Sequence, residues 1–458
     1  MKILFSIKKC CGNLLPDGFK KYQLTLYLLT LVLCFLCFQH GDLFHTIISA
    51  KAYLNGHFLD FYDYNKPIVS GNDYFPLLYL IFALWLLPLK ALGLLGPAKS
   101  LTVVVIVWSK LLLVSCFVGL AVITYKISTV LTDGDVKQSQ LTAAIFATNP
   151  IAVFAVFIFG QYDVIGLLIA LTGFYFYLQK KMVTCAGLFS LAISCKFFPL
   201  VIFIPLLLLS EKKPSQLLKY IGIAAALPLL QIAIYWHNEA FRSYTLFGGV
   251  AAGRLGSLSE LWLSAQLHIP YLIIVYFILC LYAYIKEPDS EIEFKKISVF
   301  LCAVAYGVFF STVVWHPQWL IYITPFFALS SIYLMQKEKF YLIELLGVCA
   351  YFFLVVVFFP KNVDATLLNS GLLSRLFVSN PIILADALSH AKFICIMRGI
   401  FLIYLFLPIL MFIFQKRNAL VSASINTQMR YFNCRFILGL AFFLVPIFFC
   451  ALMPLWLP

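Results

Sequence analysis

Asp42 is the residue of this sequence whose position best suits it to act as a base. It closes the stretch Gln39-His40-Gly41-Asp42, directly after an apolar run from about 22 to 39. A lone carboxylate at such a boundary can take the proton of a hydroxyl group while the oxygen attacks an electrophile. The competing interpretation is a helix N-cap, a position that Asp favours, because residues 42–54 can form a short helix along a surface. Both interpretations stay open at this point.

Seven further residues are candidates for binding an anion or a sugar. Lys196 has apolar sequence on both sides, so its ammonium needs either an anionic partner such as a phosphate or a route to the surface. The guanidinium group of Arg254 could bind a phosphate through two parallel hydrogen bonds. Each candidate also has a simpler interpretation as a helix start, an interfacial anchor or a solvated residue. The full set is Tyr74, Gln161, Asp163, Lys196, Arg254, His316 and Gln318.

Other charged residues receive structural interpretations. The loop carboxylates Asp60, Asp63 and Asp73 are expected to be solvated; they would suit a hard cation such as Mg²⁺, but their spacing does not indicate one. We therefore predict no metal and no cofactor. Glu344 and Arg398 lie near the ends of apolar runs, so snorkelling to the membrane surface accounts for both.

The composition identifies the kind of protein that must position these residues. Hydrophobic residues make up 63% and charged residues 11% of the 458, and the mean hydropathy is +0.98. Soluble chains average about 45–50% apolar and about 25% charged residues. The formal charge of +14 is spread in short clusters between apolar runs, which is the positive-inside pattern and not a nucleic-acid surface. We predict one polytopic membrane domain, 1–458, whose compact loops favour a bacterial plasma membrane.

The apolar runs predict about 11 spanning helices in an all-α fold. Two further stretches, 139–159 and 183–209, are interrupted at Asn149-Pro150 and at Lys196-Phe197-Phe198-Pro199, and proline breaks helices. Each arm of 183–209 reaches only about 20 Å at roughly 1.5 Å per residue, short of the ~30 Å hydrocarbon core. We therefore expect both stretches to be hairpins that return to the side they left; the alternative is two plain spans with tolerated prolines. The predicted spans are 22–39, 74–94, 101–125, 163–179, 216–236, 269–285, 297–315, 319–336, 340–359, 393–415 and 436–456.

The predicted topology has the N-terminus in the cytoplasm and three long outside segments, 40–73, 237–268 and 360–392. It brings the candidate residues from separate parts of the chain toward one face of the membrane. Neither a P-loop nor a Rossmann glycine fingerprint is present, which argues against a nucleotide-dependent enzyme.

The order of the motifs resembles the polytopic GT-C glycosyltransferases that use polyprenyl- or dolichyl-phosphate sugars, above all glycosyltransferase family 87 and the GPI-mannosyltransferase-like group. The similarity covers roughly 25–210, with one later motif. The residues that carry it are Asp42, Tyr74-Phe75-Pro76, Asn149-Pro150, Gly160-Gln161-Tyr162-Asp163, Lys196-Phe197-Phe198-Pro199 and His316-Pro317-Gln318.

The resemblance implies an inverting transfer of a mannose-like hexose from a polyprenyl-phosphate donor to an acceptor glycan or glycolipid on the outer face. Asp42 would be the general base, and Lys196, Arg254 and His316 would hold the donor phosphate. Residues 1–210 would form the catalytic module and 211–458 the remaining helices. Two alternatives stay open: a transporter or flippase of lipid-linked saccharides, and a polysaccharide polymerase or ligase.

Overall fold

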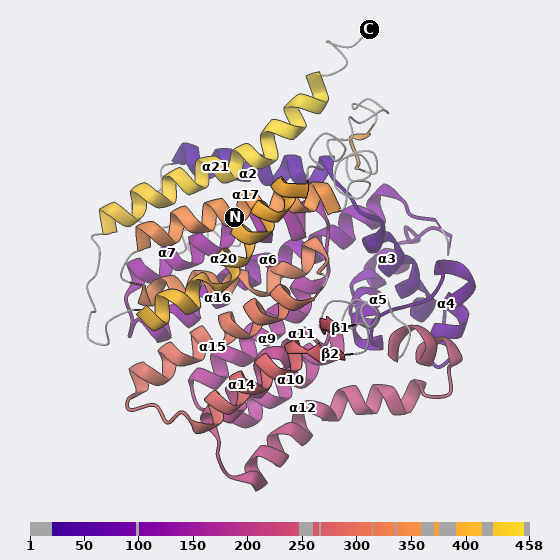
Figure 1. Cartoon of the computed structure of the whole chain (residues 1–458). Helices are drawn as coiled ribbons and strands as arrows, with labels where there is room; N and C mark the ends of the chain where they lie inside the picture. The colour runs from indigo at the N-terminus through magenta and orange to yellow at the C-terminus, as the bar shows by residue number, and fades with distance from the viewer. Residues whose placement is uncertain are drawn as a thin grey trace.

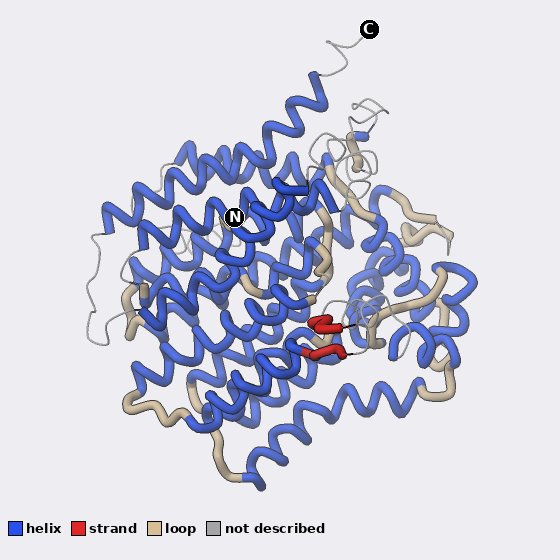
Figure 2. The backbone as a smooth tube through the Cα atoms, viewed as in Figure 1, coloured by secondary structure: helices blue, strands red, loops and turns tan. Residues whose placement is uncertain are grey.

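The computed structural model describes residues 21–97, 100–246, 260–264, 267–313, 315–334, 337–358, 371–374, 391–414 and 425–452. This part of the chain is almost entirely helical, with one short antiparallel pair of strands, β1 (Glu260–Ser264) and β2 (Leu267–Pro270) (Figures 1 and 2). Arg254 and most of the predicted outside segment 360–392 lie outside the described residues.

The helices follow the apolar runs of the sequence. Those of the first half are α2 (Lys21–Cys37), α3 (Gly41–Leu54), α4 (Phe61–Val69), α5 (Pro76–Ala91), α6 (Val103–Leu131), α7 (Val136–Ala147), α8 (Pro150–Val153), η1 (Phe154–Ile158), α9 (Asp163–Leu178), α10 (Met182–Cys195) and α11 (Phe198–Ser210). Those of the second half are α12 (Pro214–Tyr235), η2 (Phe241–Leu246), α14 (Tyr271–Ile285), α15 (Glu291–Thr312), η3 (Pro317–Tyr322), α16 (Thr324–Ser330), η4 (Ser331–Tyr333), α17 (Lys337–Phe358), α20 (Ala391–Phe414) and α21 (Ile425–Leu452).

Among the described residues, three helices are long and apolar enough to cross a membrane, namely α6, α12 and α15. The number rises to five if two bent pairs each form one span: α2 with α3, bent by 68°, and α7 with Pro150–Ile158, bent by 51°. Several shorter apolar helices surround them. The chain is thus a helical protein with the features of a membrane protein.

Most helices form a slanted bundle, and α3, α4 and α5 lie together beside it (Figure 1). Helix α12 runs along the lower edge of that view toward this group, and the phenol oxygens of Tyr235 and Tyr53 join the two at 3.0 Å. Tyr235 also donates to the carbonyl of Phe58, and Asn238 donates to that of Leu59. The group is therefore tied to the bundle at the turn between α3 and α4.

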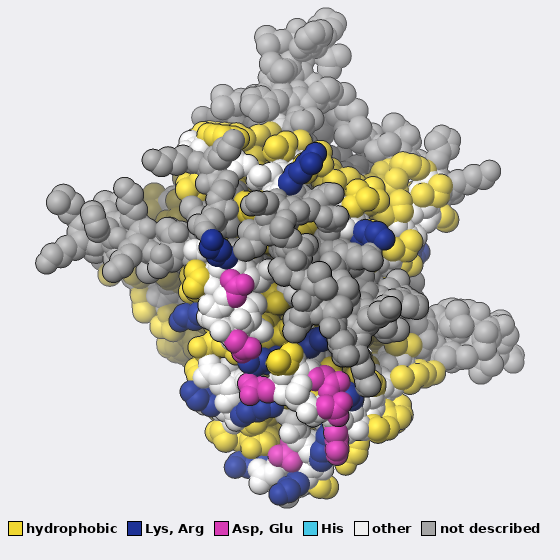
Figure 3. Space-filling model, turned by 90° about the vertical axis from the view of Figure 1, so that its left-hand side faces the viewer, with side chains coloured by type: hydrophobic (Ala, Val, Ile, Leu, Met, Phe, Trp, Pro, Cys, Tyr) yellow, Lys and Arg dark blue, Asp and Glu magenta, His cyan; other side chains and the backbone are white. Residues whose placement is uncertain are grey.

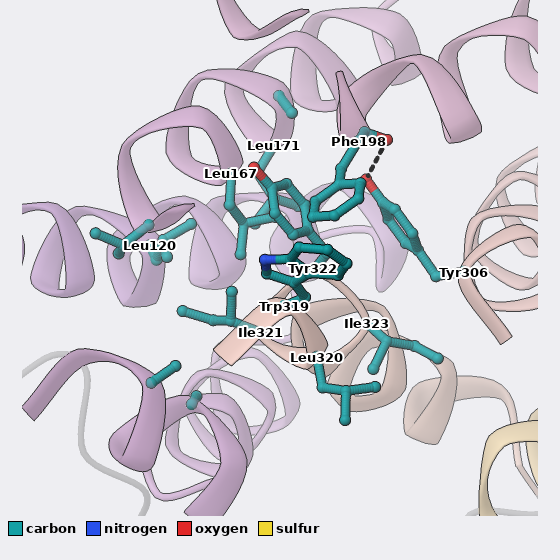
Figure 4. Close-up of a cluster of buried hydrophobic side chains, with 14 of the residues drawn as sticks. Leu120, Leu167, Leu171, Phe198, Tyr306, Trp319, Leu320, Ile321, Tyr322 and Ile323 are labelled. Carbon is teal, nitrogen blue, oxygen red and sulfur yellow. Dashed lines mark hydrogen bonds between the residues drawn. The ribbon is translucent and has the colours of Figure 1, made fainter. Parts of the chain in front are cut away.

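The predicted span 319–336 is wrong as one continuous α-helix. The chain instead forms the 3-10 helix η3, the short helix α16 and the 3-10 turn η4, and prolines occupy the first turns of η3 and α16. Figure 4 shows η3 inside the core, where Trp319 and Tyr322 lie against Phe198, whose carbonyl accepts a hydrogen bond from Tyr306 at 3.3 Å. This packing fixes the backbone that follows His316.

The hairpin predicted for 183–209 is present. Helices α10 and α11 run antiparallel, as two contacts between them show. The Ser210 hydroxyl is 3.8 Å from the Met182 sulfur, and the ring centres of Phe189 and Phe203 are 4.9 Å apart. Lys196 is at the tip, between the two helices.

The hairpin predicted for 139–159 is not formed, because the two halves differ in direction by only 51°. The Asn149 carboxamide oxygen accepts the amide N–H groups of Ile151 and Ala152, and Pro150 occupies the first turn of α8. The helix therefore restarts at once after the break and continues in the same general direction, without the turn that a reversal needs.

The predicted topology is wrong about two connecting segments. It put 126–138 and 286–296 on opposite sides, whereas Lys295 Nζ and Asp133 Oδ1 form an ion pair at 2.9 Å. Helix α5 ends beside α3, since its Lys90 donates to the carbonyl of Leu54.

The Asp133–Lys295 pair belongs to a charged end of the bundle. Figure 3 looks onto the end that is at the left of Figure 1, where Lys, Arg, Asp and Glu side chains gather in the lower half. Lys286 pairs with Glu293 there, and Lys180 lies over the ring of Phe294. Helix α9 joins this end to Asp163, and its 16 residues correspond to ~24 Å. The predicted site residues Asp163, Lys196 and Tyr74 lie at its other end.

Candidate functional site

Asp42 lies in the first turn of α3, and it is not the N-cap. The N-cap is His40, whose ring Nδ1 accepts the amide N–H of Asp42 at 3.2 Å. The Asp42 side chain keeps 36% exposure, and its Oδ1 is 3.3 Å from the same Nδ1. The N-cap interpretation of Asp42 is thus wrong, and the carboxylate is left available for chemistry.

The backbone just before His40 is fixed by a buried lysine. Lys110 of α6 is 2% exposed, and its ammonium donates to the carbonyls of Phe35 and Phe38 at the end of α2. Carbonyls at a helix C-terminus have no partner within the helix, so a cation there is favourable. Lys110 therefore sets where α2 stops and where the turn into α3 begins.

Lys196 and Asp163 form an ion pair in the protein interior. The ammonium lies 2.6 and 2.8 Å from the two carboxylate oxygens, and the side chains are 3% and 0% exposed. Asp163 also starts α9, as the helix-start interpretation predicted. Snorkelling of Lys196 is excluded by this burial.

Aromatic rings enclose the remaining sides of the Lys196 ammonium. It lies 5.1 Å from the ring centres of both Tyr74 and Trp319, and 4.8 Å from that of Phe198. Tyr74 also meets Tyr162 edge to face, with ring centres 5.0 Å apart. Such cation–π contacts stabilise a cation that has left water.

Two predicted residues have charges or contacts that reach this cluster. His316 is the N-cap of η3 and lies close enough for its charge to act on Asp42. The charge of Lys196 acts on Asp42 as well. The side chain of Gln161 is fully buried and interacts with the Asp163 carboxylate. Neither its carboxamide nitrogen nor its oxygen forms a hydrogen bond of normal geometry with a residue that the structure describes. Gln318 is 1% exposed, and no described contact links its side chain to Asp42.

Asp73 is a site residue that the sequence did not single out. It lies in the turn between α4 and α5, exposed, and close enough to Asp42 for the two negative charges to repel. Although the residue is exposed, nearby protein removes part of the hydration of its carboxyl group, which raises the pKa of Asp73, and the negative charge of Asp42 raises it further. The turn itself is held firmly, since the His45 ring contacts the carbonyls of Val69 and Gly71 at 3.0 and 2.7 Å.

Asp42 and Asp73 both keep solvent-accessible side chains, and the negative charge of Asp42 acts on both Asp73 and Asp163. His40, His316 and Lys196 act on Asp42. We call Asp42, Asp73, His40, His316 and the Lys196–Asp163 pair the acidic cluster.

A second buried ion pair corrects the interpretation of Glu344. Its side chain is 1% exposed and accepts from Arg435 of α21 at 2.5 and 3.1 Å, so it does not snorkel; Arg398, by contrast, is exposed. The carboxamide of Asn149 donates to the same carboxylate at 3.0 Å. The break between α7 and α8 is therefore tied to α17 and α21 by a satisfied polar network.

Sequence reasoning missed His40, Asp73 and Trp319 as members of the site. A signal existed for His40, because a histidine two residues before a carboxylate at a helix start can cap that helix. None existed for the Lys196–Trp319 contact, which joins residues far apart in the chain.

The described residues contain no group of three or more His, Cys, Asp or Glu side chains placed to hold a metal ion. Comparison of the chain with protein-family models and with curated proteins finds no match.

Proposed function

We propose that this chain is a polytopic membrane glycosyltransferase of GT-C architecture, with about 11 spans, that transfers a mannose-like hexose from polyprenyl phosphate. The acceptor is a hydroxyl of a glycan or glycolipid at the outer face of a bacterial plasma membrane, and the N-terminus is cytoplasmic. The observation that carries the proposal is the accessible Asp42 carboxylate, freed from capping by His40 and acted on by His316 and Lys196.

The reaction requires one base and one stabilised leaving group. Asp42 takes the proton of the acceptor hydroxyl while its oxygen forms the new bond to the anomeric carbon. The bond from that carbon to the phosphate oxygen breaks, and the electron pair leaves with the lipid phosphate. A single displacement inverts the anomeric centre.

The leaving phosphate needs positive charge, because phosphate is a weak base that departs without protonation. Within the described part of the chain, Lys196 is already neutralised by Asp163, so we assign it a positioning role and not direct phosphate binding. Among the residues that the structure describes, we assign phosphate binding to His316. Arg254, outside the described residues, is the second candidate.

The charged end of the bundle supports the orientation. Lys180, Lys286 and Lys295 lie at the end opposite Asp42, and lysine-rich loops favour the cytoplasm. This distribution supports an orientation with the acidic cluster outside, where a lipid-linked donor would be accessible.

The test is a transfer assay with the purified protein, radiolabelled polyprenyl-phosphate mannose and a panel of lipid and glycan acceptors. Product formation in detergent, where no second compartment exists, supports a transferase. Absence of product together with movement of the labelled lipid across proteoliposome membranes would identify a flippase instead.

A further inference from the structure

His40 occupies a position where histidine is unusual. Ser, Thr, Asp and Asn are the preferred N-caps because their short side chains accept the free amide N–H groups of the first turn. In α3 the Asp stands two residues later, and the imidazole Nδ1 accepts the N–H of Asp42. Capping is thus transferred from the carboxylate to the imidazole.

This hydrogen bond determines the protonation of the neutral ring. A nitrogen that accepts an N–H carries no proton of its own, so the neutral His40 has its proton on Nε2. The ring plane is held by stacking on Phe159, with ring centres 3.9 Å apart and planes inclined by 27°. Nδ1 therefore stays directed toward the first turn of α3.

The same nitrogen is 3.3 Å from the carboxylate oxygen Oδ1 of Asp42. When the ring takes a second proton, Nδ1 becomes a donor and can no longer accept the amide N–H. The Asp42 carboxylate oxygen, at 3.3 Å, is then within reach as an acceptor. Protonation of the His40 ring thus removes the N-cap of α3 and forms an ion pair between His40 and Asp42.

We propose that His40 is the positioning residue of Asp42 and its pH sensor: the neutral ring caps α3 and leaves the carboxylate free, whereas the protonated ring pairs with that carboxylate and weakens it as a base. The proposal rests on the proposed function of Asp42. Activity then falls when the ring gains its second proton, because the ion pair at Nδ1 reduces the basicity of the Asp42 carboxylate.

Other charged or titratable groups also face Asp42 and must be separated from His40. They come from four elements: Asp73 and Tyr74 from the turn before α5, Tyr162 and Asp163 at the start of α9, Lys196 from the tip of the α10–α11 hairpin, and His316 before η3. Among the other imidazoles, His45 acts on Asp73 and His316 acts on Asp42 itself, so the His316 variant is the necessary control.

The experiment compares His40→Asn, His40→Ala and His316→Asn in the purified full chain, by thermal unfolding and by transfer from polyprenyl-phosphate mannose between pH 5 and 8. Asn caps a helix but cannot be protonated in this range. We expect the Tm of His40→Asn to exceed that of His40→Ala, and the Ala variant to lose about 10- to 100-fold in kcat through displacement of Asp42. The acid-side loss of kcat should be smaller in His40→Asn than in the wild type and should persist in His316→Asn.

An unchanged acid-side loss in His40→Asn, or equal Tm values for the two His40 variants, overturns the proposal. If the wild type transfers no sugar, the proposed function fails separately. The order of the Tm values then still decides whether His40 caps α3.

Discussion

The Lys196 ammonium bridges both oxygens of the Asp163 carboxylate at 2.6 and 2.8 Å, with neither side chain exposed by more than 3%. The pair joins the tip of the α10–α11 hairpin to the first turn of α9. Removing one partner leaves an uncompensated charge in the interior, which typically costs about 3–5 kcal/mol.

We therefore predict that Lys196→Met lowers the thermal stability of the purified protein strongly, whereas the double variant Lys196→Met with Asp163→Leu recovers most of the loss. Replacing both charges by apolar groups removes the penalty that a single replacement creates. Thermal unfolding followed by intrinsic fluorescence measures both. A double variant no more stable than the single one would show that the pair is not what holds these segments together.

His316→Ala should raise the KM for the polyprenyl-phosphate donor more than it lowers the Tm. His316 precedes η3, and the η3 residues Trp319 and Tyr322 pack against Phe198, a contact that His316→Ala leaves in place. Donor titration at saturating acceptor gives the KM. A variant with normal donor dependence would move the phosphate site toward Arg254.

A further prediction concerns the Glu344–Arg435 pair, which is not part of the acidic cluster. Arg435→Met leaves the Glu344 carboxylate with only the Asn149 carboxamide as its described partner, so we expect a loss on the order of 3–5 kcal/mol. Adding Glu344→Gln keeps an acceptor for Asn149 without the charge, so the double variant should regain stability. Equal melting temperatures for the wild type and Arg435→Met would mean that the network is dispensable.

The orientation of the bundle can be tested by labelling. Asp60, in the turn between α3 and α4, and Lys181, before α10, are both exposed and lie at opposite ends of the molecule in the proposed orientation. In a variant without its native cysteines, Asp60→Cys should react with a membrane-impermeant maleimide in intact cells, and Lys181→Cys should react only after lysis. The reverse pattern would put the acidic cluster in the cytoplasm.

The sequence predicted the helix breaks but not the partners of the buried charges. Proline in a short apolar stretch identified the hairpin at Lys196, because neither arm was long enough to span. The same reasoning failed at Asn149, whose side chain caps the next helix so that it continues onward. Partners such as Asp163 for Lys196 and Arg435 for Glu344 depend on how separate helices pack, and hydrophobic pattern alone does not specify that.

The site was predicted in outline. Asp42, Asp163, Lys196 and His316 come together as expected, although Lys196 faces a carboxylate and not an open cavity. His40 and Asp73 were missed because their roles depend on local geometry. The spacing of His40 and Asp42 at a helix start was a signal for the cap, whereas the proximity of Asp73 to Asp42 depends on how α3 and the turn before α5 pack together.

The most direct test of the central claim is the turnover of Asp42→Asn in the purified transfer assay, with Asp60→Asn as the matched control. Both replacements remove one carboxylate near α3. Asp60, however, is 60% exposed and pairs with His57, which is not a member of the acidic cluster. We predict that Asp42→Asn loses roughly 10²- to 10⁴-fold in kcat, the usual contribution of a general base, with an unchanged Tm and an unaffected control. Near-wild-type turnover of Asp42→Asn would contradict the assignment of Asp42 as the base.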